Sequence, residues 1–205
     1  MKISIHIILG IIIILLSFLL YRSIIQPIRF NHDVEIREKD AISRLIDIRK
    51  AQLAYRDVYG KYTGSFDTLL YFMKYDSIEI QRKTGSYVQD EMTEAEAIHQ
   101  GLVKISSTMV SVHDSLFKNE PNIDKLQFVP YTNGQKFVLE AGQIISSSSV
   151  KVKVFEVYVL YRILLNGMNS QLVNNYIAEK ERVMGFPGLK IGSMTQVTNN
   201  NGNWE

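Results

Sequence analysis

The chain has 205 residues, of which 46% are hydrophobic and 21% are charged, so it can bury a core and does not have the composition of a disordered protein. The formal net charge of +2 is too close to balance for a nucleic-acid-binding protein, which usually concentrates basic residues on one face. The chain has no cysteine, which excludes disulfides, thiolate nucleophiles and cysteine-ligated metals.

Residues 3–21 form the first predicted element, a continuous apolar stretch. Fourteen of these nineteen residues are Ile, Leu or Phe, and as a helix the stretch spans roughly 28 Å, which matches the hydrocarbon core of a bilayer. At about 0.3 to 0.6 kcal/mol each, these side chains favour insertion by roughly 4 to 8 kcal/mol. The sequence therefore predicts one transmembrane anchor within residues 1–25, with membrane contacts from Ile3, Ile8, Gly10, Ile13, Leu16, Leu20 and Tyr21.

A cleaved signal peptide is the alternative interpretation of this segment. Signal peptides have a shorter apolar stretch and end in a small-residue site such as Ala-x-Ala. This stretch ends instead in Leu-Leu-Tyr-Arg at residues 19–22, and no such site follows. An uncleaved signal anchor is therefore preferred.

A long amphipathic helix is predicted from about residue 33 to residue 59. Pro27 has no N–H to donate, so it is expected to kink or end the helix before this segment, and Gly60 suits the C-cap. The run of charged residues is interpreted as a solvated face, with a partner-binding face as the alternative. The apolar positions recur at three- and four-residue spacing, at Ala41, Ile42, Leu45, Ile48, Leu53 (or Gln52), Tyr55, Val58 and Tyr59.

The rest of the chain mixes short helices with extended segments. Ser65 is expected to cap a helix that packs on the long one, Thr93 and Glu96 form a capping box, and Asn169 begins another helix. A tight hairpin is predicted at residues 132–134, Thr-Asn-Gly. The helices are expected at 66–74, 94–100 and 171–183, and the extended segments at 77–81, 103–112, 126–131, 136–140, 143–145, 150–161 and 189–194.

The sequence has no internal repeat and no long linker, so one soluble α+β domain is predicted over residues 26–198. A polar tail follows at 199–205 and contains Trp204, the only tryptophan. The tail is interpreted as a frayed terminus. The alternative is a docking peptide, because a terminal indole has a large apolar area to bury.

The end of the long helix resembles the type IV pilins and the type II secretion pseudopilins. In those proteins a membrane helix has a proline near its exit and continues into an amphipathic helix, which ends in a pattern similar to Ala-Gln-x-x-Tyr and then Gly-x-Tyr. The matching residues here are Ala51, Gln52, Tyr55, Gly60 and Tyr62, and the Ser-Phe-Asp-Thr-Leu of residues 65–69 is similar to the turn that follows. The resemblance covers roughly residues 1–75.

The resemblance implies a pilin-like fold, in which the long helix packs on a mostly antiparallel sheet, and a domain outside the cytoplasmic membrane. Residues 1–7 have neither the leader-processing site nor the glutamate of those families, so an uncleaved relative is implied. The positive-inside rule alone gives a near tie, leaning slightly toward a cytoplasmic domain. Helix–sheet packing or interaction is expected from Ala51, Tyr55, Tyr59, Gly60, Tyr62 and Trp204.

The sequence offers no set of residues for catalysis, a cofactor or a metal. None of the four histidines pairs with another at ligand spacing, so zinc is not supported. His113, Asp114 and Ser115 have the letters of a catalytic triad, but adjacent residues on an extended chain point to opposite faces. The chain is therefore predicted not to be an enzyme and to need no cofactor or metal.

The predicted function is that of a non-enzymatic, membrane-anchored structural or assembly subunit of the bacterial cell envelope, pilin- or pseudopilin-like. The predicted location is the inner membrane, crossed once, with the soluble domain facing the periplasm. The predicted partners are the lipid bilayer and proteins of an envelope assembly, and not nucleic acid. The alternative is a membrane-tethered binding module for a peptide or glycan, which a pocket lined by Tyr and Phe would favour.

Overall fold

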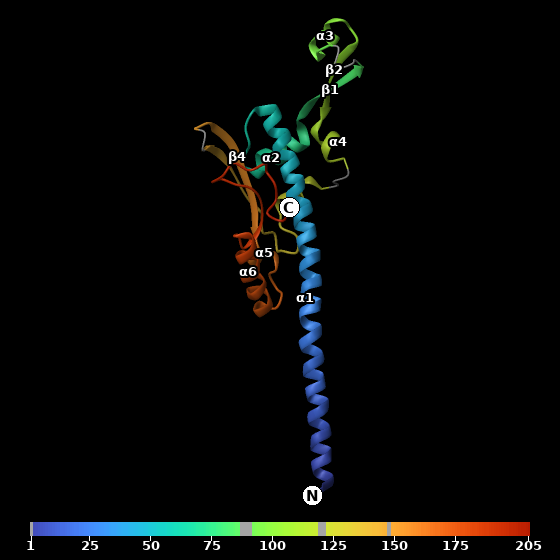
Figure 1. Cartoon of the computed structure of the whole chain (residues 1–205), viewed down its shortest axis with the longest axis vertical. Coiled ribbons are helices and arrows are strands. Elements are labelled where there is room, and N and C mark those ends of the chain that lie inside the picture. The colour runs from blue at the N-terminus through green and yellow to red at the C-terminus, as the bar shows by residue number, and fades with distance from the viewer. Residues whose placement is uncertain (1, 87–91, 119–121, 147–148) are drawn as a thin grey trace.

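The computed structural model describes residues 2–86, 92–118, 122–146 and 149–205. Its dominant element is α1 (Lys2–Tyr59), a helix of 58 residues that runs from the amino terminus to the base of the projecting arm (Figure 1). The other elements surround the carboxyl-terminal half of α1, and the amino terminus lies alone at the far end (Figure 1).

The sequence predicts that Pro27 kinks or ends the helix. The helix does not end there, because α1 continues through this residue. Proline removes one hydrogen bond, here to the carbonyl of Ser23, and costs about 3 kcal/mol within a helix. Burial of α1 against the domain begins only three residues later, at Phe30. This burial offsets the loss and keeps the helix continuous.

The amino-terminal half of α1 is exposed and apolar. It is long and apolar enough to cross a membrane, as a membrane anchor or a signal sequence would, and none of its most apolar stretch is buried by the described residues. Of the predicted anchor residues, Ile13, Leu16, Leu20 and Tyr21 are exposed, and nothing lies within 4 Å of a Cβ placed on Gly10. The backbones of Ile3 and Ile8 belong to α1, and their side chains lie outside the described part.

Helix α2 (Phe66–Tyr75) begins at Ser65, whose side chain accepts a hydrogen bond from the Thr68 N–H, as the sequence predicts. Its apolar side is buried, and the ring of Phe72 meets the ring of Tyr55 on α1 edge to face at 5.3 Å. The predicted packing of α2 on the long helix is confirmed.

A two-stranded antiparallel arm follows α2. Strands β1 (Ser77–Gly85) and β2 (Val103–Ser111) pair from Ser77 opposite Ser111 to Gly85 opposite Val103. Helix α3 (Glu94–His99) lies at the tip and has the predicted capping box between Thr93 and Glu96. The arm projects from the end of the molecule opposite the amino terminus (Figure 1), and α4 (Val112–Leu116) leads back to the body.

The strand and tight hairpin predicted over residues 126–134 are wrong. A 3₁₀ turn, η1 (Ile123–Gln127), occupies the start of this region. The chain then makes one bridge between Phe128 and Lys136, closed by a hydrogen bond of 2.7 Å from the Val129 N–H to the Gln135 carbonyl. Pro130 has no N–H for a further pair, so the turn widens instead of closing at Thr132.

The main sheet has three antiparallel strands in the order β3 (Val138–Ile145), β4 (Lys151–Leu160) and β5 (Gly188–Gly192). The two fragments predicted at 136–140 and 143–145 are parts of the single strand β3.

Two helices separate β4 from β5: α5 (Tyr161–Leu164) and α6 (Ser170–Met184). Asn169 caps α6 as predicted, since its side chain accepts a hydrogen bond from the Leu172 N–H at 3.2 Å. Buried side chains from Phe30 to Ile191 form one core cluster between α1, α2 and this sheet. The α+β class is confirmed, as mixed helices and antiparallel sheets with a long apolar amino-terminal helix.

Candidate functional site

The residues predicted to pack the long helix have different surroundings. Ala51 is fully buried and Tyr55 nearly so, but the ring partners of Tyr55 are Phe72 of α2 and Tyr59 of α1 rather than the sheet. Tyr62 makes the ring contact with the sheet, with its centroid 4.8 Å from that of Phe155 on β4. The motif residues therefore link α1 to both α2 and the sheet.

Tyr59 and Gly60 lie at the carboxyl end of α1. Tyr59, expected in helix–sheet packing or interaction, is 49% exposed, and its ring partners are Tyr55 of α1 and Phe72 of α2. Its hydroxyl donates a hydrogen bond to Asp76, and this bond raises the pKa of Tyr59. Gly60 has a φ of 67° and is the expected C-cap, since its N–H binds the Arg56 carbonyl at 2.7 Å.

Three arginines of α1 bind backbone carbonyls of distant segments, and we call them the arginine row. Arg37 donates to the Leu164 and Asn166 carbonyls at 2.9 and 3.0 Å. Arg44 donates to the carbonyls of Lys125 and Phe128, and Arg49 to that of Asn200 at 3.2 Å. The interpretation of the charged run as a solvated face is therefore wrong for these three positions, because their guanidinium groups bind other segments of the same chain.

A polar cluster also joins α1 to α5 and α6. The Tyr176 hydroxyl donates to the Glu38 carboxylate at 2.7 Å, and the ring of Tyr176 meets that of Tyr161 edge to face at 5.3 Å. Burial, together with the nearby Glu38 carboxylate, raises the pKa of both tyrosines well above its ordinary value. Both phenols therefore remain protonated and serve as neutral packing groups.

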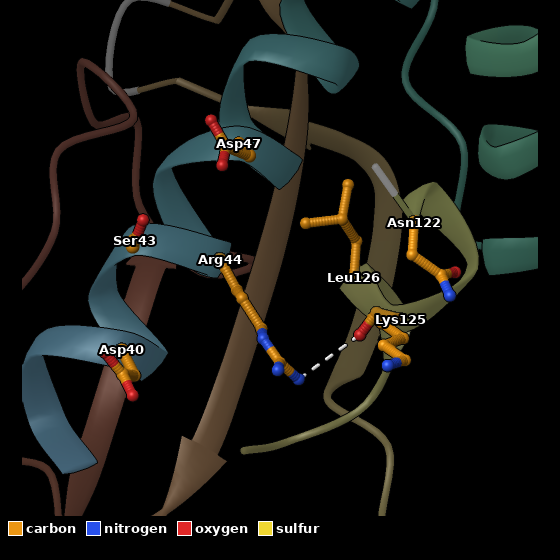
Figure 2. Close-up of a pocket in the computed structure, with 7 residues that line it drawn as sticks. All are labelled: Asp40, Ser43, Arg44, Asp47, Asn122, Lys125 and Leu126. Carbon is orange, nitrogen blue, oxygen red and sulfur yellow. Dashed lines mark hydrogen bonds between the residues drawn. The ribbon is translucent and has the colours of Figure 1, made fainter. Parts of the chain in front are cut away.

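A hollow of about 320 Å³ lies between α1 and η1 (Figure 2). Arg44 crosses it from α1 toward the Lys125 carbonyl, and two carboxylates, Asp40 and Asp47, lie on either side of Arg44 along the helix (Figure 2). The other lining residues are Ser43, Asn122, Lys125 and Leu126.

Both carboxylates of this hollow have hydrogen-bond partners. Asp40 accepts a hydrogen bond from Tyr131, which raises the pKa of that phenol, and Asp47 accepts one from Lys50 at 2.7 Å. Ser43 is the lining hydroxyl, no histidine is among the lining residues, and no hydrogen bond joins Ser43 to either lining carboxylate in the described part of the chain. The geometry suits a structural junction better than a nucleophile–base pair.

A larger hollow of about 670 Å³ separates the upper part of α1 from the base of the arm. Its apolar wall comes from Leu53, Ala54, Val58, Ile78, Met109 and Leu116. Neither this hollow nor the one beside η1 has a tyrosine or phenylalanine among its lining residues. Neither therefore has the aromatic lining that a binding module for glycans would favour.

His113, Asp114 and Ser115, which have the residue types of a catalytic triad, lie in α4. The prediction that this segment is extended is therefore wrong. His113 Nδ1 is 3.1 Å from the Asp114 carboxylate, but both side chains are exposed. The hydroxyl of Ser115 contacts neither of them in the described part of the chain. Among the described residues, no group of three His, Asp or Glu side chains could hold a metal ion.

The polar tail lies against the sheet of its own domain, which contradicts a frayed terminus. Asn203 donates its N–H to the Lys190 carbonyl at 3.0 Å and accepts the Lys190 N–H through its side chain. Glu205 forms an ion pair with Arg49 at 2.8 Å, and Trp204 packs partly buried against the core. The tail extends the sheet beside β5 and connects it to α1.

Sequence reasoning missed the arginine row and the buried amide of Gln52. This amide donates to the Thr63 carbonyl at 2.6 Å and accepts the Thr63 N–H at 3.1 Å. The helical period allowed either Gln52 or Leu53 inside, and no local signal separates the two. For the arginines the partners lie at least 81 positions away, so no short motif contains both halves of a contact.

Comparisons of the chain with protein-family models, with curated proteins and with solved structures found no match.

Proposed function

We propose that this protein is a non-enzymatic, membrane-anchored structural or assembly subunit of the bacterial cell envelope, pilin- or pseudopilin-like in build. The amino-terminal half of α1 crosses the inner membrane once, and the domain faces the periplasm. The carboxyl-terminal half of α1 carries the domain and its arm away from the bilayer. One observation carries this proposal: a single helix is bare and apolar at one end and the buried axis of a domain at the other.

Exposure supports an anchor over a core helix of a soluble protein. Ile14 is 72% exposed and Ile28 is 58% exposed, and such a row of bare apolar side chains in water is unfavourable by about 25 cal/mol per Å². Lipid removes that cost. The unbroken passage of α1 through Pro27 into the domain supports a retained anchor over a cleaved signal sequence.

The pilin-like part of the proposal rests on the resemblance over residues 1–75 together with the position of the sheet. The sheet β3–β4–β5 lies against the carboxyl-terminal half of α1, with Tyr62 between them. The domain's placement in the periplasm rests on the same resemblance. An assembly role is preferred to a binding module because the two hollows between α1 and the other elements of the domain, beside η1 and at the base of the arm, have no aromatic lining.

Anchoring and sidedness are tested first. Carbonate-washed membranes are expected to retain the full-length chain, and release of the chain would contradict the anchor. Alkaline phosphatase fused at the carboxyl terminus is expected to be active, because that enzyme folds only outside the cytoplasm. An inactive phosphatase with an active β-galactosidase fusion at the same position would contradict the periplasmic placement.

Assembly is tested by crosslinking in intact cells. A photoreactive residue is placed at Met109 on the arm or at Tyr75 on α2, which are 66% and 68% exposed. A discrete adduct with an envelope protein or with a second copy of the chain is expected at one of them. A control at Val183 of α6, 71% exposed, reports non-specific collisions. The same adducts at all three positions, or none at any, would contradict an assembly role.

A further inference from the structure

A shallow hollow lies on the flank of α1 just past its most apolar stretch, with a volume of about 320 Å³. Its lining residues recur every three or four positions, so they share one face of the helix. The side chains nearer the amino terminus are mainly apolar, and those nearer the domain are mainly polar. The lining residues are Phe18, Tyr21, Arg22, Ile25, Gln26 and Arg29.

Both charged residues of this hollow are cationic. Neither Arg22 nor Arg29 forms an ion pair in the part of the chain that the structure describes, and no carboxylate lines the hollow. The two arginines are seven residues apart, which puts them on the same face and roughly 10 Å apart along the axis. Gln26 lies between them and offers a neutral donor.

The direction of the helix aims these groups at the bilayer surface. Side chains on a helix lean toward its amino terminus, which here is the membrane end, so the long side chain of Arg29 leans back toward Arg22. Arg22 directly follows the nineteen-residue apolar stretch and thus marks the edge of the hydrocarbon core. Arg29 lies about one headgroup layer farther out.

Every lining residue of this hollow belongs to α1, so the domain leaves the site open. Phe30, the residue after Arg29, is 7% exposed and packs edge to face on Tyr176 of α6 at 6.1 Å. The contacts of α1 with the domain therefore begin one residue beyond the hollow. At this depth in a membrane the abundant anion is the phosphodiester of a lipid headgroup.

We propose that this hollow binds one anionic phospholipid. Arg22 and Arg29 hold the phosphate, and Gln26 donates to a phosphate or glycerol oxygen. The ring of Phe18 and the side chain of Ile25 contact the first methylene groups of an acyl chain. The inference rests on the proposed membrane anchor and adds a ligand to it.

Native mass spectrometry of the full-length protein in detergent tests the proposal, with phosphatidylglycerol and phosphatidylcholine of the same acyl chains as probes. The wild type is expected to prefer phosphatidylglycerol roughly 30-fold, the factor that two basic residues near an anionic surface supply. The double variant R22Q/R29Q is expected to lose most of this preference. The matched control is R82Q, which removes an exposed arginine of the arm that has no ion pair among the described residues.

Equal binding of the two lipids by the wild type, or an unchanged preference in R22Q/R29Q, would overturn the proposal. Displacement of phosphatidylglycerol by millimolar inorganic phosphate would also overturn it, because the site would then be a simple anion site. Carbonate extraction separates this failure from failure of the anchor. If R22Q/R29Q stays in washed membranes without its lipid preference, the proposal is supported and the anchor is intact.

Discussion

Ile14 and Ile48 belong to the same helix, yet Ile14 is 72% exposed and Ile48 only 1% exposed. Between Leu9 and Arg29 the side chains of α1 touch little else in the described chain. Beyond Phe30 the same helix buries a stripe of residues and binds distant segments of the chain through the arginine row. The difference is one of surroundings, since the backbone conformation is the same in both halves.

Under the proposed function, the two halves of this helix lie in two different solvents. A membrane anchor needs only a sufficiently long run of apolar side chains, because lipid imposes no shape on the amino-terminal half. The carboxyl-terminal half needs a specific pattern, because each buried position meets a particular neighbour. Substitutions should therefore act on different properties in the two halves.

The largest expected effect is on membrane retention. Replacing Ile13 and Leu16 with aspartate changes the insertion free energy by roughly 3 to 4 kcal/mol each, which together removes about as much as the whole stretch provides. The double variant is expected in the supernatant after carbonate washing. Ile36→Asp, on an exposed position of the other half, should remain in the pellet. Retention of the double variant would show that residues outside this stretch hold the chain in the membrane.

The next effect is on the stability of the domain. Leu45 is fully buried, so Leu45→Ala should lower the free energy of unfolding by about 2 to 5 kcal/mol. Fluorescence of Trp204, the only tryptophan, reports the transition because its ring packs on the core. Ile14→Ala is the matched control and should leave this transition unchanged. An equal loss in both variants would erase the distinction between the two halves.

Alkaline pH should destabilise the domain that surrounds the carboxyl-terminal half of α1. Burial raises the pKa of Tyr161 and Tyr176 in the folded protein above the ordinary value of 10.0. The folded state therefore keeps protons that the unfolded state loses, and stability is full below pH 10.0 and falls above it. The slope is at most about 1.4 kcal/mol per pH unit for each tyrosine. The free energy of unfolding, measured on both sides of this pH, should fall less in Tyr161→Phe than in the wild type. In the exposed control Tyr71→Phe it should fall as much as in the wild type.

A smaller effect is expected at the buried amide of Gln52. Gln52→Leu removes both hydrogen bonds to the Thr63 backbone and leaves its buried N–H and carbonyl unpaired. The expected loss of unfolding free energy is about 1 to 3 kcal/mol. Gln81→Leu, on the exposed face of the arm, should cause almost no loss of unfolding free energy. A neutral Gln52→Leu variant would indicate that the loop after α1 is held by other contacts.

The smallest effect is expected at the ion pair between Arg49 and Glu205, whose side chains are 22% and 33% exposed. Arg49→Gln should lower the unfolding free energy by less than about 1 kcal/mol. Hydrogen exchange is the better measurement, because the Asn203 N–H should exchange faster once the tail loosens. Lys50→Gln serves as the control, since its partner Asp47 lies on the same helix. Unchanged exchange in Arg49→Gln would mean that the contacts of the tail with β5 and with the core hold it without Arg49.

The sequence predicted those features whose cause is local. The caps at Ser65, Thr93 and Asn169 and the end of α1 at Gly60 each depend on a side chain or a φ angle within a few residues. The long apolar stretch needs no partner at all. Such features can be read from one segment of sequence.

Features that depend on distant segments could not be predicted. The helical period of α1 did not show whether Gln52 or Leu53 is the buried residue. Gln52 is buried because the chain after α1 folds back and places the backbone of Thr63 beside its amide. Pro130 disfavours a strand at its own position. The single bridge between Phe128 and Lys136 depends on the conformation of all the residues between them, which no local signal gives. The partners of the arginine row lie far along the chain, so a carbonyl-binding arginine and a solvated one look the same in sequence.

The tail beside β5 has a consequence for the edge of the sheet. The backbones of Asn201 and Asn203 form hydrogen bonds with Gly192 and Lys190 along the edge of β5 that does not face β4. An uncovered strand edge can pair with strands of neighbouring polypeptides. By covering this edge, the tail lowers the tendency of the domain to associate through β5.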